Sequence, residues 1–91
     1  MRTFSRTNQF KKDIKRAEKR GQDMVKLKAM LERLIDGDPL PPDCRDHPLR
    51  GDFAGSRDCH IEPDWVLIYT LTEEGAHLCF ERTGTHSDLF R

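Results

Sequence analysis

The chain lacks any apolar run close to the roughly 18 residues that a membrane-spanning helix needs. Its first residues, MRTFS, contain no apolar signal segment, so we expect a cytoplasmic protein without membrane contact. Cysteine is scarce at three residues, and the absence of any Cys-x-x-Cys pair argues against a disulfide framework. A chain of 91 residues supports one modest core, which predicts a single domain spanning 1–91.

Net charge is also missing, because 16 Lys and Arg balance 16 Asp and Glu. The balance hides a division along the chain. Residues 1–35 hold eleven basic and four acidic side chains (11 − 4 = +7), and residues 36–91 hold five and twelve (5 − 12 = −7). A locally basic surface can bind a polyanion even in a neutral protein, so nucleic-acid partners are not excluded.

Two amphipathic helices are predicted in the basic part. The first follows Thr7, whose hydroxyl can cap it, and ends near Gly21; the second follows Asp23 and ends at Gly37. Their short connection predicts an antiparallel hairpin. The apolar stripes are Phe10, Ile14 and Ala17 in the first helix, and Met24, Leu27, Met30, Leu31, Leu34 and Ile35 in the second.

The hydrophobic period changes in the second part of the chain. Residues 57–61 and 77–82 alternate like half-buried strands, and residues 65–71 form a continuous apolar run typical of a strand buried on both faces. Residues 2–4 are long enough only for an edge strand, and the tail, 83–91, shows little core signal. The predicted fold is α+β, with the N-terminal helical hairpin packed on a mostly antiparallel four- to five-stranded sheet.

Histidine is the residue type best suited to chemistry here, because it exchanges protons near neutral pH. Two positioned histidines can act as base and acid in cleaving RNA through the 2′-hydroxyl, if a cation such as Arg57 or Arg82 binds the phosphate. We assign His77 to an ordinary structural role at the start of a strand. The other three lie at loops or strand ends: His47, His60 and His86.

Other chemistries have weaker signals. No His-x-His, HExxH or Cys-x-x-Cys spacing is present, so we expect no metal and no cofactor. Cys59 adjoins His60, but neighbours on a strand point to opposite faces, which favours packing over nucleophilic catalysis. Phe90 can pack on the sheet or stack on a nucleotide base. A dense set of cations on the first helix is either a solvated face or a phosphate-contacting surface: Lys11, Lys12, Lys15, Arg16 and Lys19.

Three segments, in this order, carry a resemblance to a known family. They are DHPLRG at 46–51, DCHIEPDWVLIY at 58–69 and FERTGTHSDLF at 80–90. Together they resemble the YafQ-type toxins of the RelE/ParE superfamily of toxin–antitoxin systems. The resemblance covers essentially the whole chain, and it is specific because three motifs recur at matching spacing.

The resemblance implies a RelE-like fold and a ribosome-dependent mRNA endonuclease, or mRNA interferase, that cuts mRNA in the ribosomal A site without a metal. It implies as partners a cognate antitoxin, the 70S ribosome and mRNA, with the toxin monomeric inside the toxin–antitoxin complex. By position, the acid–base residues are His47, His60, Asp64 and His86, and the substrate- or phosphate-binding residues are Asp58, Trp65, Arg82 and Phe90.

The division of labour within this set stays open in part. We expect His86 to protonate the leaving oxygen, and a histidine or Asp64 to activate the 2′-hydroxyl. The basic row of the first helix is expected to supply ribosome affinity. The alternatives are a non-catalytic ParE-like inhibitor of gyrase, an RNase that needs no ribosome and a plain interaction domain. The three histidines favour an enzyme, because a protein that only binds a target needs no cluster of titratable groups.

Overall fold

The five-stranded sheet of the computed structural model, which describes residues 1–90, has the strand order β1-β5-β4-β3-β2. Only β1 runs parallel to its neighbour, β5, and the other pairs are antiparallel. This confirms the predicted α+β class with a mostly antiparallel sheet. The strands are β1 (Thr3–Arg6), β2 (His47–Pro48), β3 (Arg57–Glu62), β4 (Trp65–Thr72) and β5 (His77–Gly84).

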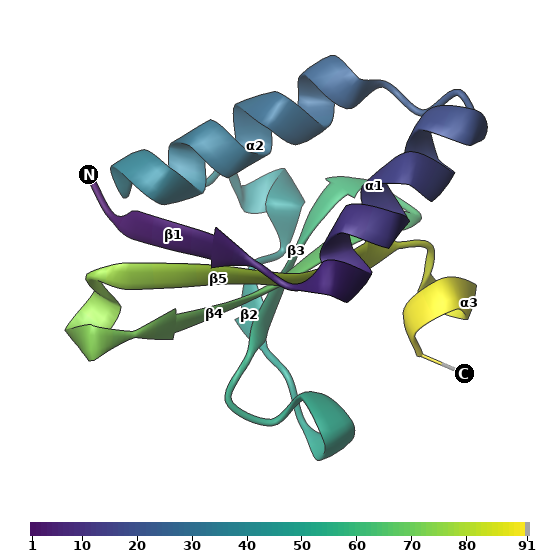
Figure 1. Cartoon of the computed structure of the whole chain (residues 1–91). Helices are drawn as coiled ribbons and strands as arrows, with labels where there is room; N and C mark the ends of the chain where they lie inside the picture. The colour runs from purple at the N-terminus through teal and green to yellow at the C-terminus, as the bar shows by residue number, and fades with distance from the viewer. Residues whose placement is uncertain (91) are drawn as a thin grey trace.

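The predicted helical hairpin is confirmed as α1 (Asn8–Lys19) and α2 (Met24–Asp36), and both helices lie on one side of the sheet (Figure 1). The Thr7 hydroxyl accepts a hydrogen bond from the Phe10 amide (2.9 Å), and the Asp23 carboxylate accepts one from Val25 (3.0 Å). Gly37 ends α2 in the left-handed region at φ +76°. Within residues 1–90, no helix is long and apolar enough to cross a bilayer.

The main core lies between the sheet and the helices. Alternate residues of β4 face the two sides, so Leu67 and Tyr69 pack towards the helices while Val66 and Ile68 face away. Fully burying one such side chain stabilises the fold by about 1.5–3 kcal/mol. The main cluster contains Phe10, Met30, Leu34, Cys44, Cys59, Leu67, Tyr69, Leu78 and Phe80.

The C-terminal segment differs from its prediction. Thr83 is 1% exposed and belongs to β5, and Leu89 is 8% exposed and packs on the outer face of the sheet. Between them lies a short helix, α3 (His86–Leu89), started by a capping box between Thr85 and Asp88. Four residues are too few to show a helical period, which is why the sequence pattern missed this element.

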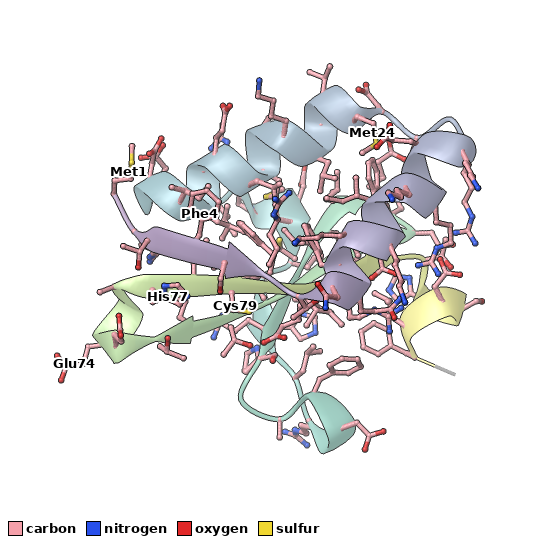
Figure 2. All side chains as sticks on the ribbon, viewed as in Figure 1. Met1, Phe4, Met24, Glu74, His77 and Cys79 are labelled. Atoms are coloured by element: carbon pink, nitrogen blue, oxygen red, sulfur yellow. The ribbon has the colours of Figure 1, made fainter. Side chains whose placement is uncertain are left out.

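His77 has the structural role that we assigned to it. Its ring bridges β5 to the edge strand β1, with Nδ1 hydrogen-bonded to the Thr3 hydroxyl (2.7 Å) and Nε2 to the Ser5 hydroxyl (3.0 Å). Figure 2 shows it at the end of the sheet away from α3. His77 therefore lies apart from the other three histidines.

Candidate active site

Strand register brings the first candidate residues onto one row across the sheet. His47 of β2 pairs with Asp58 of β3, Asp58 with Ile68 of β4, and Ile68 with Arg82 of β5. His60 lies two residues beyond Asp58 on the same face, because side chains alternate along a strand. This face is the one that α1 and α2 leave uncovered.

The short helix α3 brings His86 to the same place. Leu89 on this helix packs against Val66 and Ile68, so α3 lies on the open face of the sheet. As a result, His86 Nε2 lies 3.4 Å from His60 Nε2, with ring centroids 5.3 Å apart. The structure therefore brings together residues that are 26 positions apart in the chain.

All three site histidines are anchored in the same way. In each ring, Nδ1 lies within hydrogen-bond distance of an oxygen that can only accept, so Nδ1 carries the proton and Nε2 is left for chemistry. The acceptors are the Arg45 carbonyl for His47 (2.6 Å), the Cys44 carbonyl for His60 (3.2 Å) and the Asp64 carboxylate for His86 (2.7 Å).

The facing Nε2 atoms of His60 and His86 can hold only one proton between them. At 3.4 Å two N–H groups would point at each other, whereas one N–H and one lone pair form a hydrogen bond. The contact therefore allows one ring to act as donor and the other as acceptor. That is an acid and an acceptor placed side by side.

Asp64 determines how His86 sits. Its Oδ1 accepts hydrogen bonds from the backbone N–H of His86 (3.0 Å) and from the ring Nδ1 (2.7 Å). These two bonds hold the pKa of Asp64 below its usual value, although the side chain is exposed. Asp64 is therefore an ionised group that orients His86 and stabilises positive charge on its ring.

Asp58 has the opposite environment. It is 3% exposed, and burial raises its pKa, an effect that the nearby histidines at 47, 60 and 86 oppose. His47 Nδ1 lies 3.0 Å from Asp58 Oδ1, yet its N–H is directed to the Arg45 carbonyl, and no residue among 1–90 donates a hydrogen bond to this oxygen. The phosphate-binding role of Asp58 stays a prediction; in the structure its carboxylate is buried and faces the histidines.

Arg82 and Phe90 lie at the other border of the site. Arg82 lines a hollow together with Phe53, and Phe53 meets the Phe90 ring edge-on at a centroid distance of 5.8 Å. The Phe90 ring lies 6.0 Å from that of His86 and is 38% exposed. An exposed aromatic ring thus lies beside His86, and through Phe53 it adjoins the hollow that Arg82 lines. An aromatic ring and a cation suit a nucleotide base and its phosphate.

Trp65 is a correction to the predicted site. It is 0% exposed, packs against Ala17 and Leu27 below the helices, and donates its indole N–H to the Thr83 hydroxyl (3.0 Å). It adjoins Asp64 in sequence, but its side chain points to the helix face. Its ring is a core element and cannot stack on a substrate base.

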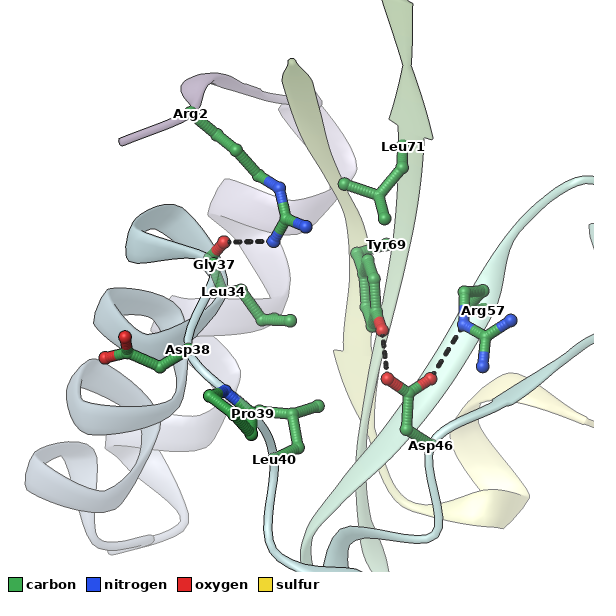
Figure 3. A pocket seen from close by; sticks show the side chains of 10 residues that line it. All are labelled: Arg2, Leu34, Gly37, Asp38, Pro39, Leu40, Asp46, Arg57, Tyr69 and Leu71. Atoms are coloured by element: carbon green, nitrogen blue, oxygen red, sulfur yellow. Dashed lines mark hydrogen bonds and ion pairs between the residues drawn. The ribbon is translucent and has the colours of Figure 1, made fainter. Parts of the chain in front are cut away.

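Arg57, the other candidate for the phosphate cation, also faces the helices. Its Nε donates to Asp46 (2.9 Å), which also accepts the Tyr69 hydroxyl (2.6 Å), inside a hollow of about 500 Å³ (Figure 3). Arg82 on the histidine face is therefore the better candidate. The thiol of Cys59 lies in the core, where burial raises its pKa, so it is unsuited to act as a nucleophile.

The basic helix α1 divides into two faces. Arg16 is a second correction, because its guanidinium binds inward to Asp13 (3.1 Å), to the Thr83 carbonyl (3.2 Å) and near Asp88 (3.6 Å). It is a structural contact and not a free cation. The lysines are exposed and, within residues 1–90, form no ion pair: Lys11, Lys12, Lys15 and Lys19.

Two site residues were absent from the sequence prediction. Asp13 lies in phase with Phe10 and Ala17 on the apolar stripe of α1, and a charged residue in that phase is a usable signal of a buried ion pair. Phe53 lies in a polar loop and gives no such signal. Among residues 1–90, no group of three or more His, Cys, Asp or Glu side chains is arranged to hold a metal ion.

Known proteins resemble this chain in sequence and in fold. The family model described as the bacterial toxin of type II toxin–antitoxin system, YafQ, matches residues 2–91. The mRNA interferase toxin YafQ of Escherichia coli strain K12 is 51% identical over 90 residues, which cover 98% of this chain and 96% of that protein. The solved structure of YafQ from E. coli strain BL21(DE3) is 49% identical with a TM-score of 0.93, covering 100% of both chains.

A further solved structure is the E. coli DinJ-YafQ toxin–antitoxin complex, in which the matching chain is 50% identical with a TM-score of 0.90 and coverage of 99% and 98%. The helical hairpin on one face of a mostly antiparallel sheet is the fold of the RelE-like class of small α+β toxins. Within that class, the chain belongs to the YafQ family of type II toxin–antitoxin toxins.

Proposed function

We propose that this toxin is an mRNA endonuclease that acts on the translating ribosome and cuts by metal-independent acid–base catalysis. The observation that carries the proposal is the set of three histidines, each anchored through Nδ1, on one open face of the sheet. The relative from E. coli is named an mRNA interferase, and this chain shares its fold over its full length.

In this reaction the 2′-hydroxyl gives its proton to a base, and its oxygen forms a bond to phosphorus. The bond from phosphorus to the 5′-oxygen breaks, and that oxygen takes a proton from an acid, which yields a 2′,3′-cyclic phosphate and a 5′-hydroxyl. His86 is the acid, because ionised Asp64 stabilises its protonated ring and His60 offers only a lone pair to it.

His47 is our choice for the base. A separation of 3.4 Å leaves no room for a phosphate between His60 and His86, and while His86 holds its proton the Nε2 of His60 is occupied as the acceptor for it. The Nε2 of His47 is not, and its ring is half exposed on the same row as Arg82. The Arg82 guanidinium then supplies positive charge to the phosphate in the transition state.

The test compares mRNA on programmed ribosomes with the same RNA alone, read by primer extension. We expect wild-type protein to cut the A-site codon, with chelator present, and to leave naked RNA intact. Equal cleavage of naked RNA would support a free-standing RNase. Inhibition of gyrase without any RNA cleavage would support the non-catalytic alternative.

The exposed lysines of α1 are proposed to contact ribosomal RNA, because four cations lie on one helix and form no ion pair with any of residues 1–90. Reversing Lys15 and Lys19 to Glu should weaken ribosome pelleting in a salt-dependent way. The control reverses Lys28 and Arg33, two exposed cations of α2, for the same change in charge. Equal losses in the two variants would contradict a specific role for α1.

A cognate antitoxin is the proposed protein partner. The E. coli relative has been solved in complex with DinJ as a toxin–antitoxin complex. We infer that the present chain is a monomeric toxin that a neighbouring antitoxin covers. Co-expression with the product of the adjacent short reading frame should give a stable complex and relieve growth arrest.

A further inference from the structure

The outer edge of β5 changes partner halfway along. β1 pairs with residues 77–80 of β5 and stops at Arg6, while β5 continues to Gly84. From this point α1 lies along the edge instead of a strand. Thr7 begins the exchange, with its N–H donating to the Phe80 carbonyl (3.2 Å) and its hydroxyl to the Glu81 carbonyl (2.8 Å).

Beyond the end of β1, the side chain of Asp13 bonds the edge of β5 where a neighbouring strand would otherwise pair with it. Its Oδ2 accepts the backbone N–H of Thr83 (3.1 Å), while Arg16 donates to the Thr83 carbonyl (3.2 Å). Asp13 itself is 1% exposed, and a buried carboxylate needs full compensation by hydrogen bonds. It receives further bonds at Oδ1 from Gln9 (3.2 Å) and Arg16 (3.1 Å).

The same carboxylate holds Arg82 with two parallel hydrogen bonds. Arg82 Nε donates to Asp13 Oδ2 (2.8 Å) and Nη2 to Oδ1 (3.2 Å), which is the fork geometry that fixes a guanidinium plane. Within residues 1–90, no acceptor binds Nη1. The bonds from Asp13 therefore fix one edge of the guanidinium and leave the opposite edge for an anion.

Arg82 comes from the sheet face that carries the histidines. Arg82 is in register with His47 and Asp58 across the sheet, and its hollow is shared with Phe53, which contacts Phe90. An arginine in this place has many rotamers, so without a fixed partner it would reach the phosphate only part of the time.

We propose that Asp13 is a positioning residue that holds Arg82 in the orientation that contacts the scissile phosphate. This inference rests on the proposed nuclease function. Asp13 touches no substrate, and its effect reaches the reaction only through the Arg82 guanidinium. A transition-state contact held in place by a buried partner should affect the rate of the chemical step more than binding.

The first test needs no activity. In the NMR spectrum of the free protein, the Arg82 Nε–H should exchange slowly with water, because it is bonded to a buried carboxylate. Asp13→Asn should move this resonance and speed its exchange, while Ala17→Gly, a change in the same helix that leaves Arg82 untouched, should not. Fast exchange in the wild-type protein would overturn the proposed hold of Asp13 on Arg82, whatever the cleavage activity of the protein.

The second test is a double-mutant cycle on programmed ribosomes. At saturating toxin, Asp13→Asn should lower the single-turnover cleavage rate about tenfold, with a small change in the half-saturating concentration. In an Arg82→Ala background the same change should lower the cleavage rate less than twofold, because the guanidinium through which Asp13 acts is already absent. Asp13→Glu should restore part of the rate if its longer side chain keeps the fork.

The outcomes separate the two proposals. Equal losses from Asp13→Asn in both backgrounds, or a loss that follows the melting temperature as in Ala17→Gly, would overturn the positioning role while the nuclease remains. Failure of the wild-type protein to cut ribosome-bound mRNA would instead overturn the proposed function. The exchange rate of the Arg82 Nε–H would still show whether Asp13 holds Arg82.

Discussion

Two histidine–carboxylate pairs lie on the same sheet face, and they differ in almost every physical respect. Asp64 is exposed, accepts two hydrogen bonds from His86 and has a lowered pKa. Asp58 is buried beside His47, has an oxygen without a hydrogen-bond donor among residues 1–90 and has a raised pKa. The first carboxylate stays ionised, and the second takes up a proton more readily than an ordinary aspartate.

The two pairs differ in whether the hydrogen bonds of the carboxylate are satisfied. The His86–Asp64 pair has its hydrogen bonds satisfied in the free protein, which suits the proposed role of His86 as the acid. The His47–Asp58 pair keeps a buried charge short of hydrogen bonds, which costs stability, and such groups concentrate at functional sites. Neutralising Asp64 should therefore lower the stability of the fold at neutral pH, whereas neutralising Asp58 should not.

The largest effect is expected at His86. His86→Gln should lower the cleavage rate on programmed ribosomes by about a thousandfold, because the leaving oxygen loses its proton donor. An mRNA with a sulfur in place of the bridging 5′-oxygen at the cleavage site needs no such donor, so it should restore most of the rate.

The mRNA with the bridging 5′-sulfur also tests the proposed role of His47 as the base. His47→Gln should lower the rate strongly on both substrates, because sulfur at the leaving position does not help a missing base. Rescue of His47→Gln in place of His86→Gln would reverse the two roles. His77→Gln serves as the matched control, since this ring only bridges β5 to β1 and should leave the rate unchanged.

Asp64→Asn comes next, with an expected loss of about ten- to thirtyfold, because the His86 ring loses its charged partner. Since folding lowers the pKa of Asp64, its contribution to stability is present above the ordinary aspartate value near 4 and disappears as pH falls through the lowered value. The melting temperature of the variant should therefore be lower than that of wild type at pH 7 and equal to it near pH 2.

Glu74→Gln is the control for that charge change, because Glu74 lies on an exposed turn at the other end of the sheet (Figure 2). A variant of Asp64 with wild-type activity would mean that His86 is oriented by other contacts.

Asp58→Asn should lower the cleavage rate about tenfold without lowering stability at pH 7. Folding raises the pKa of Asp58, so its contribution to stability is complete below pH of about 4 and is lost as pH rises through the raised value. Asparagine imitates the protonated form. The melting temperature at neutral pH should equal or exceed that of wild type, and a clear decrease would show that ionised Asp58 stabilises the fold.

The smallest effect is expected at Asp88, which caps α3 and receives Arg20 in a two-bond ion pair (2.7 and 3.2 Å). The Arg20 bond and the helix cap lower the pKa of Asp88, so its stabilising contribution is present at neutral pH and lost in acid. Asp88→Asn should lower the melting temperature by about 3 °C at pH 7 and cleavage about threefold. NMR signals of His86 should shift, and those of His47 should stay in place.

Local patterns in the sequence predicted most of the fold. The caps at Thr7 and Asp23 and the terminator at Gly37 placed both long helices, since capping depends on a few neighbouring residues. The uninterrupted apolar run predicted β4 as a strand buried on both faces. The short helix α3 was missed, because only the packing of Leu89 on the sheet makes four residues helical.

The site was predicted in composition but not in arrangement. Resemblance to the family selected the histidines at 47, 60 and 86, whereas it also selected Trp65, which the sheet places in the core. The pleat decides this difference, because adjacent residues of a strand point to opposite faces. Arg16 likewise belongs to a basic row in sequence and to an internal ion-pair network in space.

The sequence by itself determined the α+β class, the boundaries of the two long helices, the family and the residues available for acid–base chemistry, since these depend on local period and on motifs. Only the tertiary structure decided which side chains meet. Strand register and the docking of α3 bring His60 and His86 into contact, and the early end of β1 gives Asp13 its place beside Arg82. Such contacts join residues up to 69 positions apart, and no short-range pattern encodes them.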